Sequence, residues 1–139
     1  MYPFERFSDD AKTVLVSAQQ AAESARHSYI GTEHVLLGLL RGDSTAARIL
    51  VGLGVDETAA AETIERVLGR NERIVIQQIV PTSRVKKVIE LSFDAAERES
   101  SELVTAEHLV VGLLEEGEGI AAHVLGDMGV TLERFQEAR

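Results

Sequence analysis

The sequence predicts an all-α fold built from two copies of one four-helix unit, with eight helices in total. Three observations support this prediction. The chain has 45% hydrophobic residues, two prolines and no tryptophan, a composition that favours helix over sheet. Its apolar residues recur at the three- and four-residue spacing of a helix face. A motif at residues 33–40 also returns at residues 107–114.

The internal repeat relates the two halves of the chain by a nearly constant offset. Residues 33–40 (EHVLLGLL) align with residues 107–114 (EHLVVGLL) at an offset of 74, and ten of the 33 positions from residue 8 to residue 40 are identical. One inserted residue then raises the offset to 75, which aligns Gly54 with Gly129. We therefore divide this single domain into repeat one (4–69), an extended linker (70–80) and repeat two (81–139).

The first two helices of each repeat are predicted from apolar spacing and capping residues. Residues 11, 14, 15, 18, 22 and 25 form one apolar face, and Ser8 is a suitable N-cap before it, with Thr82 as its counterpart in repeat two. The second helix is expected to start near Gly31 or Thr105 and to run through the leucine-rich segment to about residue 41 or 115.

The remaining elements follow from glycines and caps. A short third helix is expected over residues 46–50 and 121–125, followed by Gly54 and Gly129, where a left-handed residue would end it. Asp56 and Thr131 are the predicted caps of a fourth helix. The linker is rich in β-branched residues and is expected to be extended, with a short strand-like stretch. Repeat two stops before the counterpart of Gly69, which suggests a fragment or a trimmed domain.

Charge and composition exclude several classes of partner. The formal net charge of −9 disfavours nucleic acids and anionic membranes. The absence of cysteine excludes disulfides and thiolate metal sites. No apolar run approaches the roughly 18 residues of a membrane span, and the N-terminus lacks a signal-peptide pattern. We expect a cytoplasmic protein that is a monomer in isolation.

No catalytic or cofactor motif is present, so we predict a non-enzymatic protein without cofactors. The three lysines, Lys12, Lys86 and Lys87, do not lie in a Walker loop. No His-Glu-x-x-His metal motif occurs, because the order is Glu-His at residues 33–34 and 107–108. We expect His34 and His108 to be structural residues near the start of the second helix, and we predict no metal site.

Glu33 and Glu107 occupy equivalent positions in the first turn of that helix, and two interpretations stay open. An acid there stabilises the helix N-terminus by about 0.3–1 kcal/mol. Alternatively, each carboxylate faces a groove and binds a cation. For the second interpretation, both carboxylates should lie on the outside of the molecule.

Three segments resemble the N-terminal Clp-repeat domain of ClpC-type AAA+ unfoldases: residues 4–8 (FERFS), 29–40 (YIGTEHVLLGLL) and 84–92 (RVKKVIELS). The resemblance covers nearly the whole chain. It implies two pseudo-symmetric four-helix bundles that hold protein substrates and adaptors above an ATPase ring, which feeds a ClpP-type protease. ClpP contact would then need the attached ATPase.

The resemblance also implies functional residues. In this family the Glu of each Glu-His pair is implicated in binding phosphoarginine, a degradation mark, which assigns Glu33 and Glu107. The helix-start residues Ser8, Thr32 and Thr82 are expected near these sites, and backbone N–H groups at a helix start would bind the phosphate. Adaptors or cyclic-peptide antibiotics are expected on a surface that includes Phe4 and Lys86.

Two features leave alternatives. Repeat two departs from the motif, with Thr105-Ala106 in place of Gly-Thr and Leu103 in place of the aromatic residue. The same sequence also fits a free-standing Clp-repeat protein without an ATPase, which would act as a decoy or adaptor.

Overall fold

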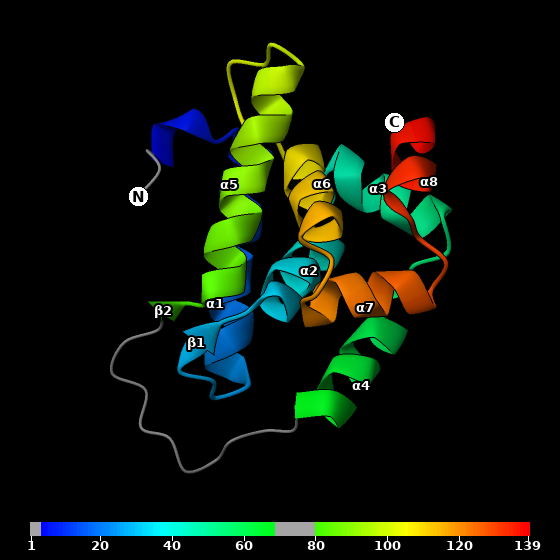
Figure 1. The fold of residues 1–139 in the computed structure, drawn as a ribbon. Helices are drawn as coiled ribbons and strands as arrows, with labels where there is room; N and C mark the ends of the chain where they lie inside the picture. Colours follow the sequence, from blue (N-terminus) through cyan, green and yellow to red (C-terminus); the bar gives the residue numbers. More distant parts are fainter. Residues whose placement is uncertain (1–3, 69–79) are drawn as a thin grey trace.

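The computed structural model describes residues 4–68 and 80–139, and its eight α-helices follow the predicted order (Figure 1). The elements are η1 (Phe4–Arg6), α1 (Asp9–Ser24), β1 (Tyr29–Ile30), α2 (Thr32–Arg41), α3 (Thr45–Gly52), α4 (Glu57–Leu68), β2 (Val80–Pro81), α5 (Ser83–Arg98), α6 (Ala106–Glu116), α7 (Ile120–Asp127) and α8 (Leu132–Ala138). The all-α prediction is confirmed. Most of the predicted linker lies outside the described residues, apart from Val80 in β2.

Side-chain caps set the helix starts where the sequence predicts them. Ser8 accepts a hydrogen bond from the Ala11 N–H (3.3 Å), and Thr82 accepts one from the Val85 N–H (3.2 Å). Each cap satisfies one of the N–H groups that a helix start leaves without a partner. Gly54 and Gly129 follow α3 and α7 with φ of +102° and +82°, the left-handed conformation that glycine adopts without strain.

Two helix pairs form the framework, α1 with α2 and α5 with α6 (Figure 1). A glycine lets the helices of each pair approach closely. A Cβ on Gly38 would lie 2.6 Å from the Val14 carbonyl oxygen, and a Cβ on Gly112 would lie 2.5 Å from the Val88 carbonyl oxygen. The glycine of the repeated motif is therefore a packing residue in both halves.

The two repeats are joined crosswise at the starts of their first helices. β1 of repeat one pairs in parallel with β2, and the Thr82 N–H donates to the Ile30 carbonyl (2.9 Å). At the other end, Phe7 forms a bridge with Val104, whose carbonyl accepts from the Ser8 N–H (2.9 Å). Each first helix therefore starts against the loop that leads into the second helix of the other repeat.

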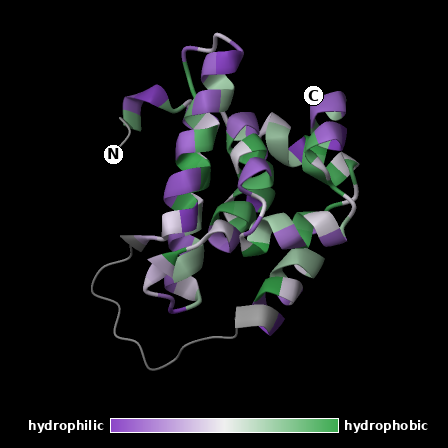
Figure 2. Cartoon of the chain, in the orientation of Figure 1, coloured by the Kyte–Doolittle hydropathy of each residue, from purple (hydrophilic) through white to green (hydrophobic). Residues whose placement is uncertain are grey.

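The core lies between the helices, with α2 and α6 at its centre. Figure 2 shows hydrophobic residues concentrated on the inward faces of the helices and hydrophilic ones on their outer faces. Leu36, Leu39, Leu109 and Leu113 from these two helices are almost fully buried. Thr32, at the start of α2, is also buried, and its hydroxyl accepts from the Ala121 N–H of α7 (3.2 Å).

Candidate functional site

The Glu-His pair of each repeat lies at the start of its second helix, where the histidine side chain accepts a hydrogen bond from the backbone just before the helix. The Nδ1 atom of His34 accepts from the Gly31 N–H (2.8 Å), and Nδ1 of His108 accepts from the Thr105 N–H (2.9 Å). Both rings are buried. The prediction that these histidines are structural is confirmed, and the bond fixes each ring so that Nε2 points away from the helix start.

In repeat one, Nε2 of His34 faces a second histidine. The His34 Nε2 and His27 Nδ1 atoms are 2.8 Å apart. Since Nδ1 of His34 is an acceptor, its Nε2 carries the proton of the neutral ring and donates to His27. Burial first, and the nearby His27 second, lower the pKa of His34 to about 4. The His34 ring is therefore uncharged at neutral pH.

Glu33 does not lie on the outside, which corrects the expectation that both carboxylates face solvent. It is 3% exposed, and its carboxylate accepts from its own backbone N–H and from the Tyr29 hydroxyl. The carboxylate fits because Gly31 has no side chain: a Cβ there would lie 2.2 Å from the Glu33 Oε1 atom. Burial raises the pKa of Glu33 despite these bonds, and burial with the Glu33 charge raises the pKa of Tyr29 to about 12.

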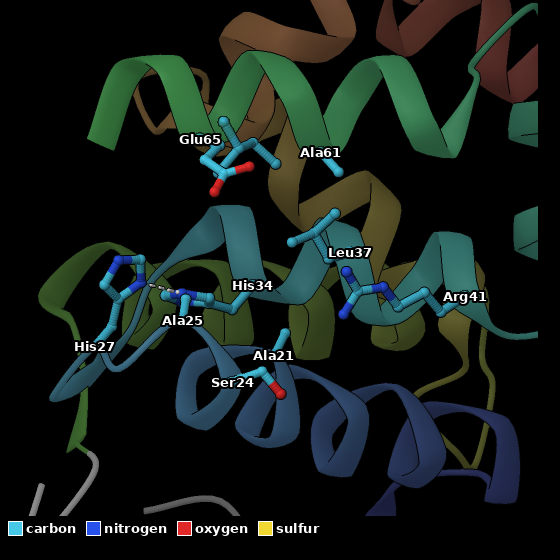
Figure 3. Close-up of a pocket in the computed structure, with 10 residues that line it drawn as sticks. Ala21, Ser24, Ala25, His27, His34, Leu37, Arg41, Ala61 and Glu65 are labelled. Carbon is cyan, nitrogen blue, oxygen red and sulfur yellow. Dashed lines mark hydrogen bonds between the residues drawn. The ribbon is translucent and has the colours of Figure 1, made fainter. Parts of the chain in front are cut away.

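A pocket of about 180 Å³ opens beside His34, between α1, α2 and α4. Figure 3 shows His27 and His34 at one end and Arg41 at the other, with Ala61 and Glu65 of α4 across from α1. Its walls include Ala25 and Ile64. The pocket is thus lined mainly by small and apolar side chains next to the histidine pair.

Repeat two holds an ionic network at the corresponding place. Nε2 of His108 lies 2.8 Å from Oε1 of Glu99. The Arg139 guanidinium binds both Glu99 oxygens, through NH1 (2.6 Å) and NH2 (3.0 Å), and its Nε donates to Glu107 (2.7 Å). The hydrogen bond from Arg139 is the main reason that the pKa of Glu99 is lowered to about 2. Glu107 therefore presents its carboxylate to a guanidinium, unlike Glu33.

The three predicted helix-start residues have different surroundings. Ser8 and Thr82 cap α1 and α5, and the crosswise pairing brings Ser8 beside the approach to α6 and Thr82 beside the approach to α2. Each therefore lies near the Glu-His pair of the other repeat. Thr32 is buried and caps α7, so its hydroxyl serves the packing of the two repeats.

Phe4 and Lys86 are both exposed. The Phe4 ring packs against Phe7, and the ammonium group above it belongs to Lys12, 5.4 Å from the ring centroid. A shared surface of Phe4 and Lys86 stays a prediction.

Sequence reasoning missed four participants: His27, Tyr29, Glu99 and Arg139. A signal for two of them was available in the repeat, because the offsets align Glu99 with Ala25 and Arg139 with Ile64. Across the described residues, no group of three or more His, Asp or Glu side chains is arranged to hold a metal ion. Within the same ranges, no helix is long and apolar enough to cross a membrane.

Comparison with known proteins identifies the family to which this fold belongs. Residues 6–128 match the model of the Clp repeat (R) N-terminal domain, so the chain belongs to this family. The domain itself is non-catalytic. A solved N-terminal domain of the chaperone ClpD from Arabidopsis thaliana has the same fold, with a TM-score of 0.80, 23% identity and coverage of 99% of this chain and 94% of that one.

Two relatives place the chain within the family more closely. It is 43% identical to the negative regulator of genetic competence ClpC/MecB of Bacillus subtilis and 42% identical to a chaperone protein ClpB of Oceanobacillus iheyensis, each over 96% of this chain. The chain spans only 16% and 17% of the length of these two relatives. The resemblance inferred from the repeated motif is thereby confirmed.

Proposed function

We propose that this chain recognises protein substrates and adaptors for a ClpC-like unfoldase in ATP-dependent proteolysis, and that it reads phosphoarginine marks through Glu33 and Glu107. Family membership and the 43% identity to a ClpC protein support the recognition role. Binding of adaptors or cyclic peptides at Phe4 and Lys86 belongs to the same proposal, since both side chains are exposed.

The observation that carries the phosphoarginine proposal is the guanidinium contact at Glu107. The Arg139 Nε atom lies 2.7 Å from Oε1 of Glu107, which is the charge-assisted bond that a phosphoarginine guanidinium would make. The α1 start, with Ser8, lies beside the approach to this helix and offers backbone N–H groups of the kind that bind phosphate.

Repeat one requires a rearrangement before it takes the same ligand. Glu33 would have to leave its buried place against Gly31 and Tyr29 and rotate outward. Burial of an ionised carboxylate is costly, which the raised pKa of Glu33 reflects, so this rotation recovers solvation. A ligand guanidinium would then replace the Tyr29 hydroxyl as partner of the carboxylate.

Calorimetric titration with phosphoarginine tests the proposal. We expect binding to the unaltered chain, reduced by Glu107→Gln and by Glu33→Gln, and abolished by the double variant. Glu133→Gln is the matched control, because Glu133 is also a first-turn acid but is exposed on α8. No heat at millimolar phosphoarginine with a folded chain would refute the phosphoarginine reading, and equal loss in the control would refute the residue assignment.

A further inference from the structure

Repeat two contains a two-carboxylate arrangement that nothing in the repeated motif describes. Glu99, at the end of α5, and Glu107, in the first turn of α6, converge on one guanidinium. Three N–H···O contacts of 2.6–3.0 Å join that group to the two side chains, and the Arg139 side chain is only 18% exposed. A planar guanidinium has the donor geometry to satisfy two carboxylates together, which an ammonium group lacks.

The surroundings hold this arrangement in place. His108 Nε2 lies 2.8 Å from Oε1 of Glu99, and the His108 ring is itself fixed by the Thr105 N–H. On the other side, Gln136 Oε1 accepts from Arg139 NH1 (2.8 Å). The position of Glu99 is therefore set by a buried ring.

Repeat one gives an internal comparison for this contact. The counterpart of Glu99 is Ala25 and the counterpart of Arg139 is Ile64, both of which line the pocket beside His34. At these two positions repeat one therefore has neither a carboxylate nor a guanidinium. The contact is a property of repeat two, which has charged residues at both of these positions.

We propose that Glu99 and Glu107 form a guanidinium-binding site in repeat two and that Arg139 is its intramolecular occupant, so an arginine-type ligand binds there only by displacing Arg139. The proposal rests on the recognition role above and adds a second carboxylate and a competitor to it. Since a ligand binds only the fraction of molecules in which the site is open, the self-contact lowers the apparent affinity by that fraction.

The test compares the Glu33→Gln variant with the Glu33→Gln, Arg139→Gln double variant. Glu33→Gln removes the repeat-one carboxylate from both proteins. Phosphoarginine and N-acetyl-arginine amide are titrated separately, and backbone amide shifts at the start of α6 report binding in repeat two. Arg134→Gln is the matched control, because Arg134 is an arginine on α8, five residues before Arg139, that donates to the Gly129 carbonyl instead. Arg139→Lys keeps the positive charge but removes the planar guanidinium group.

We expect Arg139→Gln to tighten binding in repeat two several-fold, up to about tenfold, with little change in Arg134→Gln. The gain should shrink at high salt, which weakens the self-contact. Unchanged or weaker binding in Arg139→Gln would overturn the competitor assignment. Tighter binding of the arginine amide without any phosphoarginine binding would keep this proposal and refute the phosphoarginine reading instead. If neither probe shifts the α6 start in Arg139→Gln, the site assignment is wrong.

Discussion

In repeat one, the Nε2 atom of His34 faces another histidine, whereas in repeat two the same atom of His108 faces the Glu99 carboxylate. The backbone around the two rings is alike, since each Nδ1 accepts the N–H of the residue three positions earlier. Around this common frame, repeat one has a pocket with apolar walls and repeat two has an ionic network.

The difference shows that few positions decide the electrostatic character of a repeat. Gly31 leaves room for the Glu33 carboxylate over the helix start, and Tyr29 supplies a hydroxyl for it. In repeat two these positions are Thr105 and Leu103, and Glu107 is turned to Arg139. The fold thus accommodates a version of the site without an arginine ion pair and a version with one.

The largest expected effect tests whether the two repeats share their helix packing. Gly38→Ala and Gly112→Ala should each destabilise the protein by about 3 kcal/mol, because the new Cβ meets a backbone carbonyl at about 2.5 Å in both cases. Urea denaturation monitored by circular dichroism gives the midpoints. Gly126→Ala is the control, because no atom lies within 4 Å of its Cβ position, and it should be neutral or slightly stabilising. A large loss of stability in only one of these two variants would show that the repeats do not share this close helix packing.

The two repeats should lose stability in different pH ranges on acidification. The folded-state pKa of His34, about 4, lies below its usual value of about 6.5, so its contribution is complete above pH 6.5 and is lost as the pH falls toward 4. The loss is on the order of 3 kcal/mol. Glu33 acts in the opposite direction, since its raised pKa adds stability as the pH falls through that pKa. Glu99, with a pKa of about 2, contributes above about pH 4.3 and loses its contribution as the pH falls toward 2.

Thermal unfolding between pH 7 and pH 2 measures these windows. His34→Gln should flatten the dependence between pH 6.5 and 4, and Glu33→Gln should remove the opposing gain in stability on acidification. Arg139→Gln should lower the stability above about pH 4.3 and should flatten its decline below that pH, where Glu99 titrates. Identical pH profiles for the unaltered chain and His34→Gln would contradict the assignment to repeat one.

A smaller effect is expected where the third helices of the repeats are capped differently. In repeat one, the residue directly before α3 caps it: the Ser44 hydroxyl accepts from the Ala47 N–H (3.1 Å). In repeat two, Gly119 stands at that position, and the hydroxyl of Thr32 from the other repeat accepts from Ala121 instead. Thr32→Val should therefore cost about 1 kcal/mol, and Thr32→Ser clearly less. Equal stability of the Thr32→Val variant in urea denaturation would show that the cross-repeat cap contributes nothing.

Local sequence patterns predicted most of the fold but did not predict the contacts between the two repeats. Ser8, Thr82, Asp56 and Thr131 are caps that act within three residues, so the sequence reveals them directly. The cap from Thr32 to α7 and the pairing of β1 with β2 join distant segments, and no periodicity encodes them.

The same limit applies to the candidate site. The Glu-His pair is visible as a repeated dipeptide, but its surroundings are set by tertiary contacts. Glu33 was expected outside because a carboxylate that binds a ligand must be accessible, yet the missing Cβ of Gly31 leaves room for it inside. Glu99 and Arg139 are 40 residues apart, and only their joint replacement of Ala25 and Ile64 hints at a pair.

The smallest expected change in stability comes from Gly31→Thr, which gives repeat one the residue of repeat two. The backbone at Gly31 is extended (φ −100°), so threonine fits without strain, but its Cβ displaces the end of the flexible Glu33 side chain. We expect a stability change below about 1 kcal/mol, because lost bonds to Tyr29 are offset by recovered hydration of the carboxylate. The pKa of Glu33 should fall toward its ordinary value, measured by carboxyl carbon NMR, and that of Tyr29 should fall from about 12. If Glu33 then binds phosphoarginine more tightly, its inward placement is what limits repeat one, whereas an unchanged pKa of Glu33 would show that Gly31 does not control where the carboxylate lies.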